Sequence, residues 1–188
     1  RALSTPSNLQ ALVCAVSLAY QRELADRGVE ADVILGHSLG ELTTLGAAGV
    51  VSPEDTIRIA AFRGQLMDRV AQQMNGGMMA VLFMPLDAVE QLLHDLHAPE
   101  RIVLANDNAP DQIVLSGDLD ILSQFEKIVV EREMGRCRRI GVMGPWHSHY
   151  MTDARHEFEA WAEPIEFHRP AAPIVLNALA REERHPTT

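Results

Sequence analysis

A single serine between two glycines is the feature that most limits how this 188-residue chain can fold. Residues 33–42 have the sequence VILGHSLGEL, so Ser38 follows a short apolar run and precedes a segment that is compatible with a helix. A strand that enters a G-x-S-x-G turn and leaves as a helix presents a serine hydroxyl as a nucleophile. Backbone N–H groups of Leu39 and its neighbours would then face a developing oxyanion. The pattern predicts an α/β fold with Ser38 as candidate nucleophile.

The chain before this turn is predicted to form an amphipathic helix. Leu12, Val16 and Tyr20 recur every four residues, and further apolar side chains lie beside them. Gly28 marks the expected end of the helix. An apolar stripe with this spacing is most often the face that a helix packs into the core, so we expect these side chains to be buried.

The turn is expected to join a strand to a helix, with a second helix after it. Val33–Leu35 is a continuous apolar run next to a glycine, which is typical of a strand buried on both faces. The next segment is compatible with a helix as far as Gly49. Ser52, followed by a proline and by an acid three residues on, predicts the start of another helix that runs to about Asn75. This order of elements is typical of α/β proteins.

Composition and charge exclude several classes of function. The formal net charge is −10, whereas the nucleic-acid backbone favours a basic surface, so we expect no nucleic-acid partner. Cys14 and Cys137 lie far apart without a C-x-x-C pair, which argues against a disulfide framework and a thiolate metal site. The apolar stretch at 11–20 is too short to cross a bilayer. We expect a cytoplasmic protein with no membrane segment and no metal.

A serine hydroxyl needs a base to become a nucleophile. At 141–151 the sequence GVMGPWHSHYM breaks an apolar run with a glycine and a proline and then places two histidines, His147 and His149. One of these two is the candidate base. His37 adjoins the serine in sequence, but neighbouring side chains on such a turn tend to point apart, so we expect it to support the site.

Four motifs occur in a fixed order along the chain: GHSLGE, AAFRG with Arg63, NDNAPDQIVLSG and GPWHSHYM. In order and spacing they resemble the malonyl-CoA:acyl-carrier-protein transacylases and the acyltransferase domains of polyketide and fatty-acid synthases. The resemblance runs over nearly the whole chain. It implies that Ser38 takes the acyl group, that Arg63 grips a free carboxylate, and that His147 is the base. His149 falls where that family has a non-catalytic residue.

The middle of the chain has a separate organisation. Residues 77–142 alternate as strand, helix, strand, strand, helix, strand, which is the ferredoxin-like order. The resemblance implies that this subdomain packs over an α/β hydrolase-like core, residues 1–76 and 143–188, and closes the active-site cleft. The glutamine motif that opens the family's domain and the asparagine that orients its histidine are not found, so we expect a fragment that lacks both ends of the domain.

The resemblance also implies a substrate and a partner. A malonyl or related acyl group would pass from CoA, by a ping-pong route, to the phosphopantetheine thiol of an acyl carrier protein, with no further cofactor. The bulk of Trp146 favours malonyl over an α-branched group, although an unusual acyl substrate stays open because tryptophan is not the common choice there. The expected substrate-binding residues are Arg63, Leu39, His37, Trp146 and Asn177.

Two other classes of function stay open. A serine hydrolase of the α/β type would use the same turn but needs an acid between Ser38 and His147, for which the candidates are Asp107, Asp118 and Asp120. A non-catalytic scaffold domain would need none of these side chains. A basic cluster is formed by Arg132, Arg136, Arg138 and Arg139. It is the candidate docking surface for an acidic carrier protein. The same residues are equally compatible with a solvated helix end and strand start.

Overall fold

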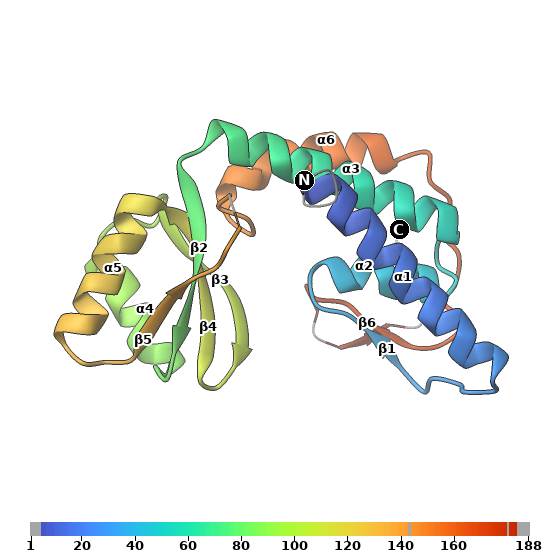
Figure 1. The fold of residues 1–188 in the computed structure, drawn as a ribbon, viewed down its shortest axis with the longest axis horizontal. Coiled ribbons are helices and arrows are strands. Elements are labelled where there is room, and N and C mark those ends of the chain that lie inside the picture. The colour runs from blue at the N-terminus through green and yellow to red at the C-terminus, as the bar shows by residue number, and fades with distance from the viewer. Residues whose placement is uncertain (1–4, 143, 180, 184–188) are drawn as a thin grey trace. The chain divides into compact units, whose positions relative to one another are not determined.

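The computed structural model describes residues 5–142, 144–179 and 181–183, which form an α/β protein with two compact units. The first unit consists of the residues up to Leu66 together with those from Phe158 onward, and the second of Met67–Glu157. Each unit has its own sheet (Figure 1). None of the helices in the described ranges has the length and apolar character that a membrane-spanning helix needs.

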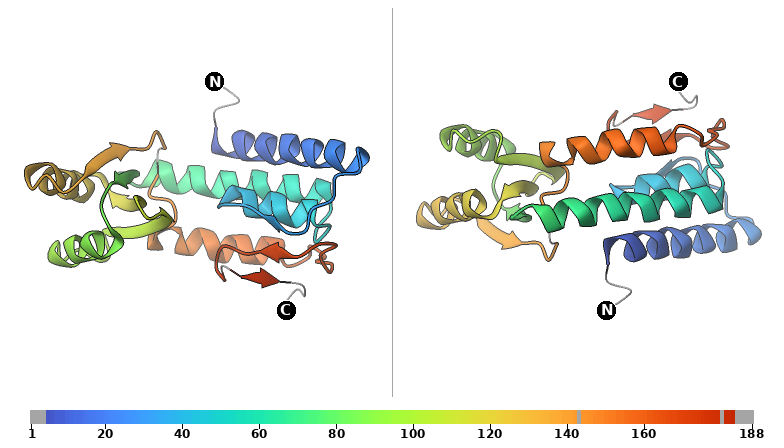
Figure 2. Two further views of the ribbon diagram at one scale, coloured as in Figure 1. Left: turned by 90° about the horizontal axis from the view of Figure 1, so that it is seen from below. Right: turned by 90° about the horizontal axis from the view of Figure 1, so that it is seen from above.

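The first unit combines helices with a short three-stranded sheet. Its strands, in sheet order, are β1 (Ile34–Leu35), β6 (Ile174–Val175) and β7 (Glu182–Glu183). β1 and β6 are parallel, and β6 and β7 are antiparallel. Its helices are α1 (Pro6–Asp26), α2 (Leu39–Ala47), the first part of α3 (Pro53–Gln73) and the last part of α6 (Thr152–Ala162). Figure 2 shows α1, α2 and α3 side by side from two opposite directions.

Helix α1 is confirmed, but the face that it buries is not the predicted one. Leu12, Val16 and Tyr20 are 43%, 52% and 70% exposed, whereas the buried side chains of α1 are those of Gln10, Cys14 and Leu18. The helix is apolar on more than one side, so periodicity alone does not fix its rotation. Polar contacts fix it instead: Gln10 and Cys14 lie on the side that meets α3 and α2.

The other local predictions in the first unit are confirmed in position. α2 ends just before Gly49, and α3 begins behind Ser52, whose Oγ accepts a hydrogen bond from the Asp55 backbone N–H at 3.0 Å. The prediction that the strand at 33–35 is buried on both faces is wrong, because Leu35 is 65% exposed. Among the described residues β1 pairs with β6 alone and is therefore an edge strand.

The second unit contains an antiparallel four-stranded sheet in the order β3-β4-β2-β5. In chain order its elements are β2 (Gly76–Leu82), α4 (Leu86–Asp95), β3 (Ile102–Ala109), β4 (Gln112–Asp118), α5 (Leu119–Glu131) and β5 (Arg136–Arg139). The predicted succession of strands and helices is therefore confirmed. Both helices lie on one face of the sheet (Figure 1). The core between them includes Met79, Leu115 and Phe125.

The second unit is wider than the subdomain expected at 77–142. It also takes in the end of α3, the start of α6 and the segment between β5 and α6. That segment carries His147 and a short 3-10 helix, η2 (His149–Met151). The candidate base, His147, thus belongs to the same unit as the four-stranded sheet, and Ser38 belongs to the first unit.

Candidate active site

Ser38 lies at the start of α2 in a strained backbone conformation. Its φ is 53° and its ψ is −106°, a combination of backbone angles that residues other than glycine rarely adopt. A Cβ on Gly36 would lie 2.2 Å from the carbonyl carbon of Gly40, so the turn brings the two glycines into close contact. The G-x-S-x-G spacing therefore has a steric reason here: only glycine at position 36 lets the strand fold back against the first turn of the helix.

Asn177, just after β6, joins both sides of this turn. Its Oδ1 accepts a hydrogen bond from the Ser38 backbone N–H at 2.7 Å, and its Nδ2 donates to the Gly36 carbonyl at 2.6 Å. Its own backbone N–H donates to Glu41 Oε1 at 3.0 Å. The amide of Asn177 is thus engaged with the protein backbone. The substrate contact expected for Asn177 stays a prediction, and the contacts described here give it a bracing role.

Arg63 extends from α3 to the serine. Its Nη2 donates to Ser38 Oγ at 3.0 Å and its Nη1 to Gln10 Oε1 at 2.6 Å. No carboxylate of the described residues lies within ion-pair distance of this half-buried guanidinium. Burial lowers the pKa of Arg63, and the nearby Cys14 and Glu41 oppose that shift. A cation held close to a serine hydroxyl without a carboxylate partner is prepared to receive an anionic group.

Cys14 is buried close to these residues. Thr43 Oγ1 donates a hydrogen bond to its Sγ at 3.3 Å. Burial raises the pKa of the Cys14 thiol, with Thr43 and Arg63 acting in the opposite direction. Cys14 therefore stays a neutral thiol near pH 7. Because only the thiolate is a good nucleophile, Cys14 is a poor one. Ser38 therefore stays the candidate nucleophile of this group.

The segment with the candidate base belongs to the second unit. His147 has a φ of 59°, in the left-handed region, and its side chain is exposed. Trp146 is half-buried, and its Nε1 has no hydrogen-bond partner among the described residues. The ring of His149 lies against that of Tyr150, with a centroid separation of 4.2 Å. The structure thus sets the two histidines apart: His147 by its backbone and His149 by its ring contact.

The structure brings together some of the predicted residues and adds one that sequence reasoning missed. Ser38, Arg63 and Asn177 meet at the turn, Leu39 is the first residue of α2, and His37 is exposed. The residue that was missed is Gln10, which lies buried against Arg63. Its sequence signal was a polar side chain inside the otherwise apolar stretch LQALVCAV.

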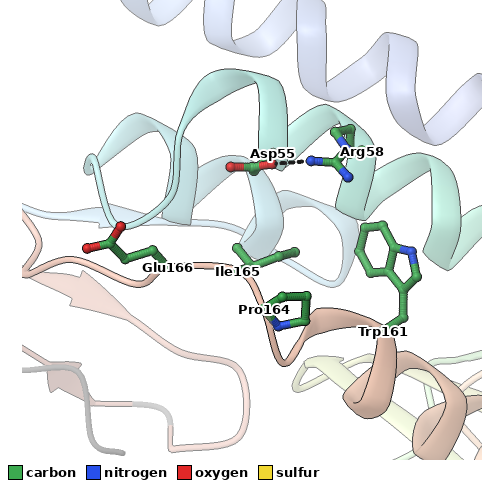
Figure 3. Close-up of a pocket in the computed structure, with 6 residues that line it drawn as sticks. All are labelled: Asp55, Arg58, Trp161, Pro164, Ile165 and Glu166. Carbon is green, nitrogen blue, oxygen red and sulfur yellow. Dashed lines mark hydrogen bonds and ion pairs between the residues drawn. The ribbon is translucent and has the colours of Figure 1, made fainter.

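A separate hollow of about 440 Å³ lies elsewhere in the first unit (Figure 3). Its lining residues are Asp55, Arg58, Trp161, Pro164, Ile165 and Glu166. Arg58 is paired with Asp55 at 2.8 Å and lies over the Trp161 ring, 5.9 Å from its centroid. The ring of Phe62 also stacks on the Trp161 ring, with a centroid separation of 4.4 Å. Because Arg58 is already engaged by Asp55 and Trp161 and the lining includes no serine or cysteine, this hollow is not the candidate active site.

Residues 3–188 match the acyl transferase domain family, and the chain belongs to that family. It is 34% identical over 175 residues to the polyketide biosynthesis malonyl CoA-acyl carrier protein transacylase PksC of Bacillus subtilis (strain 168), a match that covers 91% of this chain and 58% of PksC. The chain thus spans less than two thirds of that relative.

Solved structures show the same likeness. The malonyl-CoA:acyl carrier protein transacylase FabD of Xanthomonas oryzae pv. oryzae superposes with a TM-score of 0.91 at 31% identity, over 98% of this chain and 59% of that one. A malonyl-transacylase in complex with a type II polyketide synthase acyl-carrier protein, PlMCAT:AntF, gives 0.91 at 26% identity, over 97% and 60%. The fold of this chain is therefore that of the acyltransferases.

Proposed function

We propose that this chain carries the serine centre of a malonyl-CoA:acyl-carrier-protein acyltransferase. The observation that carries the proposal is the contact of Arg63 with Ser38. A guanidinium that has no carboxylate of the described residues at ion-pair distance lies 3.0 Å from a hydroxyl on a strained turn. An acyl group that ends in a free carboxylate, as malonyl does, would supply the missing anion while its thioester reacts at the serine.

The chemistry proceeds in two balanced transfers. Ser38 Oγ attacks the thioester carbonyl carbon as His147 takes the hydroxyl proton; the C–S bond then breaks, and CoA leaves as the thiol with that proton. In the second transfer the phosphopantetheine thiol of the carrier attacks the serine ester. The C–O bond breaks and Ser38 regains its proton. The route needs no cofactor beyond the CoA of the donor and the phosphopantetheine of the carrier.

The start of α2 supports the oxyanion part of this route. The backbone N–H groups of Gly40 and Glu41 donate to the carbonyls of His37 and Ser38, respectively. Of the first three amides of the helix, that of Leu39 has no backbone acceptor among the residues that the structure describes, and it would donate to the tetrahedral intermediate. A donor fixed at a helix start stabilises negative charge without having to reorganise.

The relatives support the donor and the partner. PksC and FabD carry names that give malonyl-CoA and the acyl carrier protein as their substrates, and the PlMCAT structure holds a carrier protein. The acid needed by the alternative, a serine hydrolase, finds less support. Asp118 and Asp120 are both engaged by Arg101, and Asp107 is exposed on β3.

We also propose that residues 77–142 form a ferredoxin-like subdomain and that residues 1–76 and 143–188 belong to an α/β hydrolase-like core. The order β2-α4-β3-β4-α5-β5, with both helices on one face and the sheet order β3-β4-β2-β5, supports the first part. The parallel pair β1 and β6, with the serine turn at the end of β1, supports the second.

Intact-protein mass spectrometry tests the proposal. After incubation with malonyl-CoA, the protein should gain the mass of one malonyl group, and the Ser38→Ala variant should gain none. Addition of an acyl carrier protein with its phosphopantetheine arm should discharge the ester. Steady release of malonate without a carrier would instead identify a hydrolase, and equal loading of the alanine variant would exclude Ser38 as the nucleophile.

A further inference from the structure

The segment that carries His147 is attached to one end of the four-stranded sheet. Gly76, the first residue of β2, pairs with Asp118, the last residue of β4. The Pro145 ring packs on Gly76, where a Cβ would lie 2.7 Å from Pro145 Cγ. On the other side of His147, Tyr150 donates its hydroxyl hydrogen to Asp118 Oδ1 at 2.7 Å. The two attachments lie on either side of His147 in the sequence, and they contact Gly76 and Asp118, which are paired across neighbouring strands.

The carboxylate that receives the Tyr150 hydroxyl is itself held in place. Arg101 Nε donates to Asp118 Oδ2 at 2.9 Å, and the Arg101 Nη2 donates to Asp120 Oδ2 at 2.5 Å. The Asp118 backbone N–H donates to the Arg101 carbonyl at 2.8 Å. Each oxygen of Asp118 therefore has its own partner, and Asp118 gives Tyr150 an anchor with little freedom.

The Tyr150 hydroxyl stays a donor under working conditions. Burial, followed by the neighbouring Asp118, raises the pKa of Tyr150 to about 12. The phenol is therefore protonated throughout the neutral range. A hydrogen bond from a neutral donor to a carboxylate is stronger than one between two neutral groups.

His147 needs such an anchor because its backbone is strained. A φ of 59° in a residue with a Cβ is stable only where the surrounding structure imposes it. On the proposed function, in which His147 is the base, that backbone sets the direction of the imidazole. We propose that Tyr150, fixed on Asp118, is a positioning residue that holds His147 in its reactive orientation.

The substitution Tyr150→Phe isolates the hydroxyl, since it keeps the ring and its contact with His149. We expect the single-turnover rate of serine loading from malonyl-CoA to fall about tenfold, the value of one charge-assisted hydrogen bond. The KM for malonyl-CoA should stay within about twofold, because the loss concerns orientation of the base rather than binding. Tyr20→Phe is the matched control, since Tyr20 is exposed on α1 and should leave the rate unchanged.

The anchor is tested from its other end. Asp118→Asn keeps an acceptor oxygen for Tyr150 and should retain more of the rate than Asp118→Ala, which removes it. Thermal unfolding of each variant accompanies the kinetics. A Tyr150→Phe variant with the loading rate of the wild type would overturn the proposal, as would a variant whose slower loading merely follows the fraction of unfolded protein.

A double-mutant cycle shows whether Tyr150 acts through His147. In a His147→Ala background, Tyr150→Phe should cause no further loss, because no imidazole is left to position. An equal tenfold loss in both backgrounds would show that Tyr150 acts independently, and it would overturn this proposal while leaving the proposed function intact. If His147→Ala alone loads at the wild-type rate, the base assignment fails and this inference fails with it.

Discussion

Asn177 holds Ser38 through the backbone: its Oδ1 accepts the hydrogen bond of the Ser38 N–H at 2.7 Å, across 139 positions of sequence. Because the Asn177 Nδ2 also binds the Gly36 carbonyl, one side chain spans the strained turn. The serine turn is thus stabilised by a residue from a distant part of the chain as well as by its own glycines.

Removing this brace should affect catalysis and stability together. We expect Asn177→Ala to lower the free energy of unfolding by about 1–3 kcal/mol, because two side-chain hydrogen bonds are lost, and to slow serine loading. Denaturant titration and single-turnover loading measure the two effects. Asn108→Ala is the control, because Asn108 is exposed near the end of β3. Loading at the wild-type rate in Asn177→Ala would contradict the bracing role.

The two glycines of the serine motif should respond differently to alanine. A Cβ at Gly36 would meet the backbone of Gly40 at 2.2 Å, whereas one at Gly40 meets no described atom within 4 Å. We therefore expect Gly36→Ala to destabilise the protein by about 3 kcal/mol or more, and Gly40→Ala to change the stability little. Thermal and denaturant unfolding of the pair decide this. Equal losses would mean that the close approach of Gly36 does not limit the turn.

Arg63 should determine the preference for a carboxylated acyl group. We expect Arg63→Ala to cost about 2–5 kcal/mol in kcat/KM for malonyl-CoA, the scale for removing one partner of a desolvated charge pair. Acetyl-CoA, which has no carboxylate, should load as well as before or better. Arg58→Ala serves as the control, because Arg58 lies on the same helix and is paired with Asp55. Equal losses for both donors would show that Arg63 supports the fold instead.

The two histidines between β5 and α6, His147 and His149, should differ in their effect on kinetics. His147→Ala should slow loading and transfer by about 10²–10⁴, the usual contribution of a general base, and His149→Ala should have a much smaller effect. Rapid-quench measurement of serine loading, in the absence of the carrier, compares the two variants without any effect on carrier binding. The reverse ranking would transfer the base assignment to His149.

The basic cluster should steer an acidic carrier protein. Of its members, Arg139 is engaged with Glu126 and Ser123, whereas Arg136 and Arg138 are exposed on the edge strand β5. The double reversal Arg136→Glu and Arg138→Glu should raise the KM for the carrier and weaken its dependence on salt, with malonyl loading unchanged. Arg22→Glu, on exposed α1, is the control for net charge. An unchanged KM would leave these arginines as ordinary solvated residues.

Local signals in the sequence were enough to predict most of the elements. Ser52 and Asp55 predicted the start of α3 because a capping contact involves only neighbouring residues. Gly28 and Gly49, which the structure places at positive φ, predicted the ends of α1 and α2 in the same way. The serine motif predicted a turn between a strand and a helix. The structure gives the steric reason, because a side chain at Gly36 would collide with the backbone of Gly40.

Features that depend on distant partners were not predictable from such signals. The buried face of α1 is set by the contacts of Gln10 and Cys14 with other helices, and no spacing within α1 reveals them. The engagement of Asn177 with the Ser38 turn likewise needs the parallel pairing of β1 and β6. Leu35 is exposed on β1, which among the described strands pairs with β6 alone, and a single apolar run discloses neither fact.

The pairing of β1 with β6 also sets an order of events during synthesis. The ribosome releases Ile34 long before its partner Ile174, and the whole of Met67–Glu157 emerges in between. Compact units generally fold as they emerge, so the nascent serine turn must wait for its brace while the intervening unit assembles. The turn that carries Ser38 is therefore completed only after nearly all of the described chain has been made.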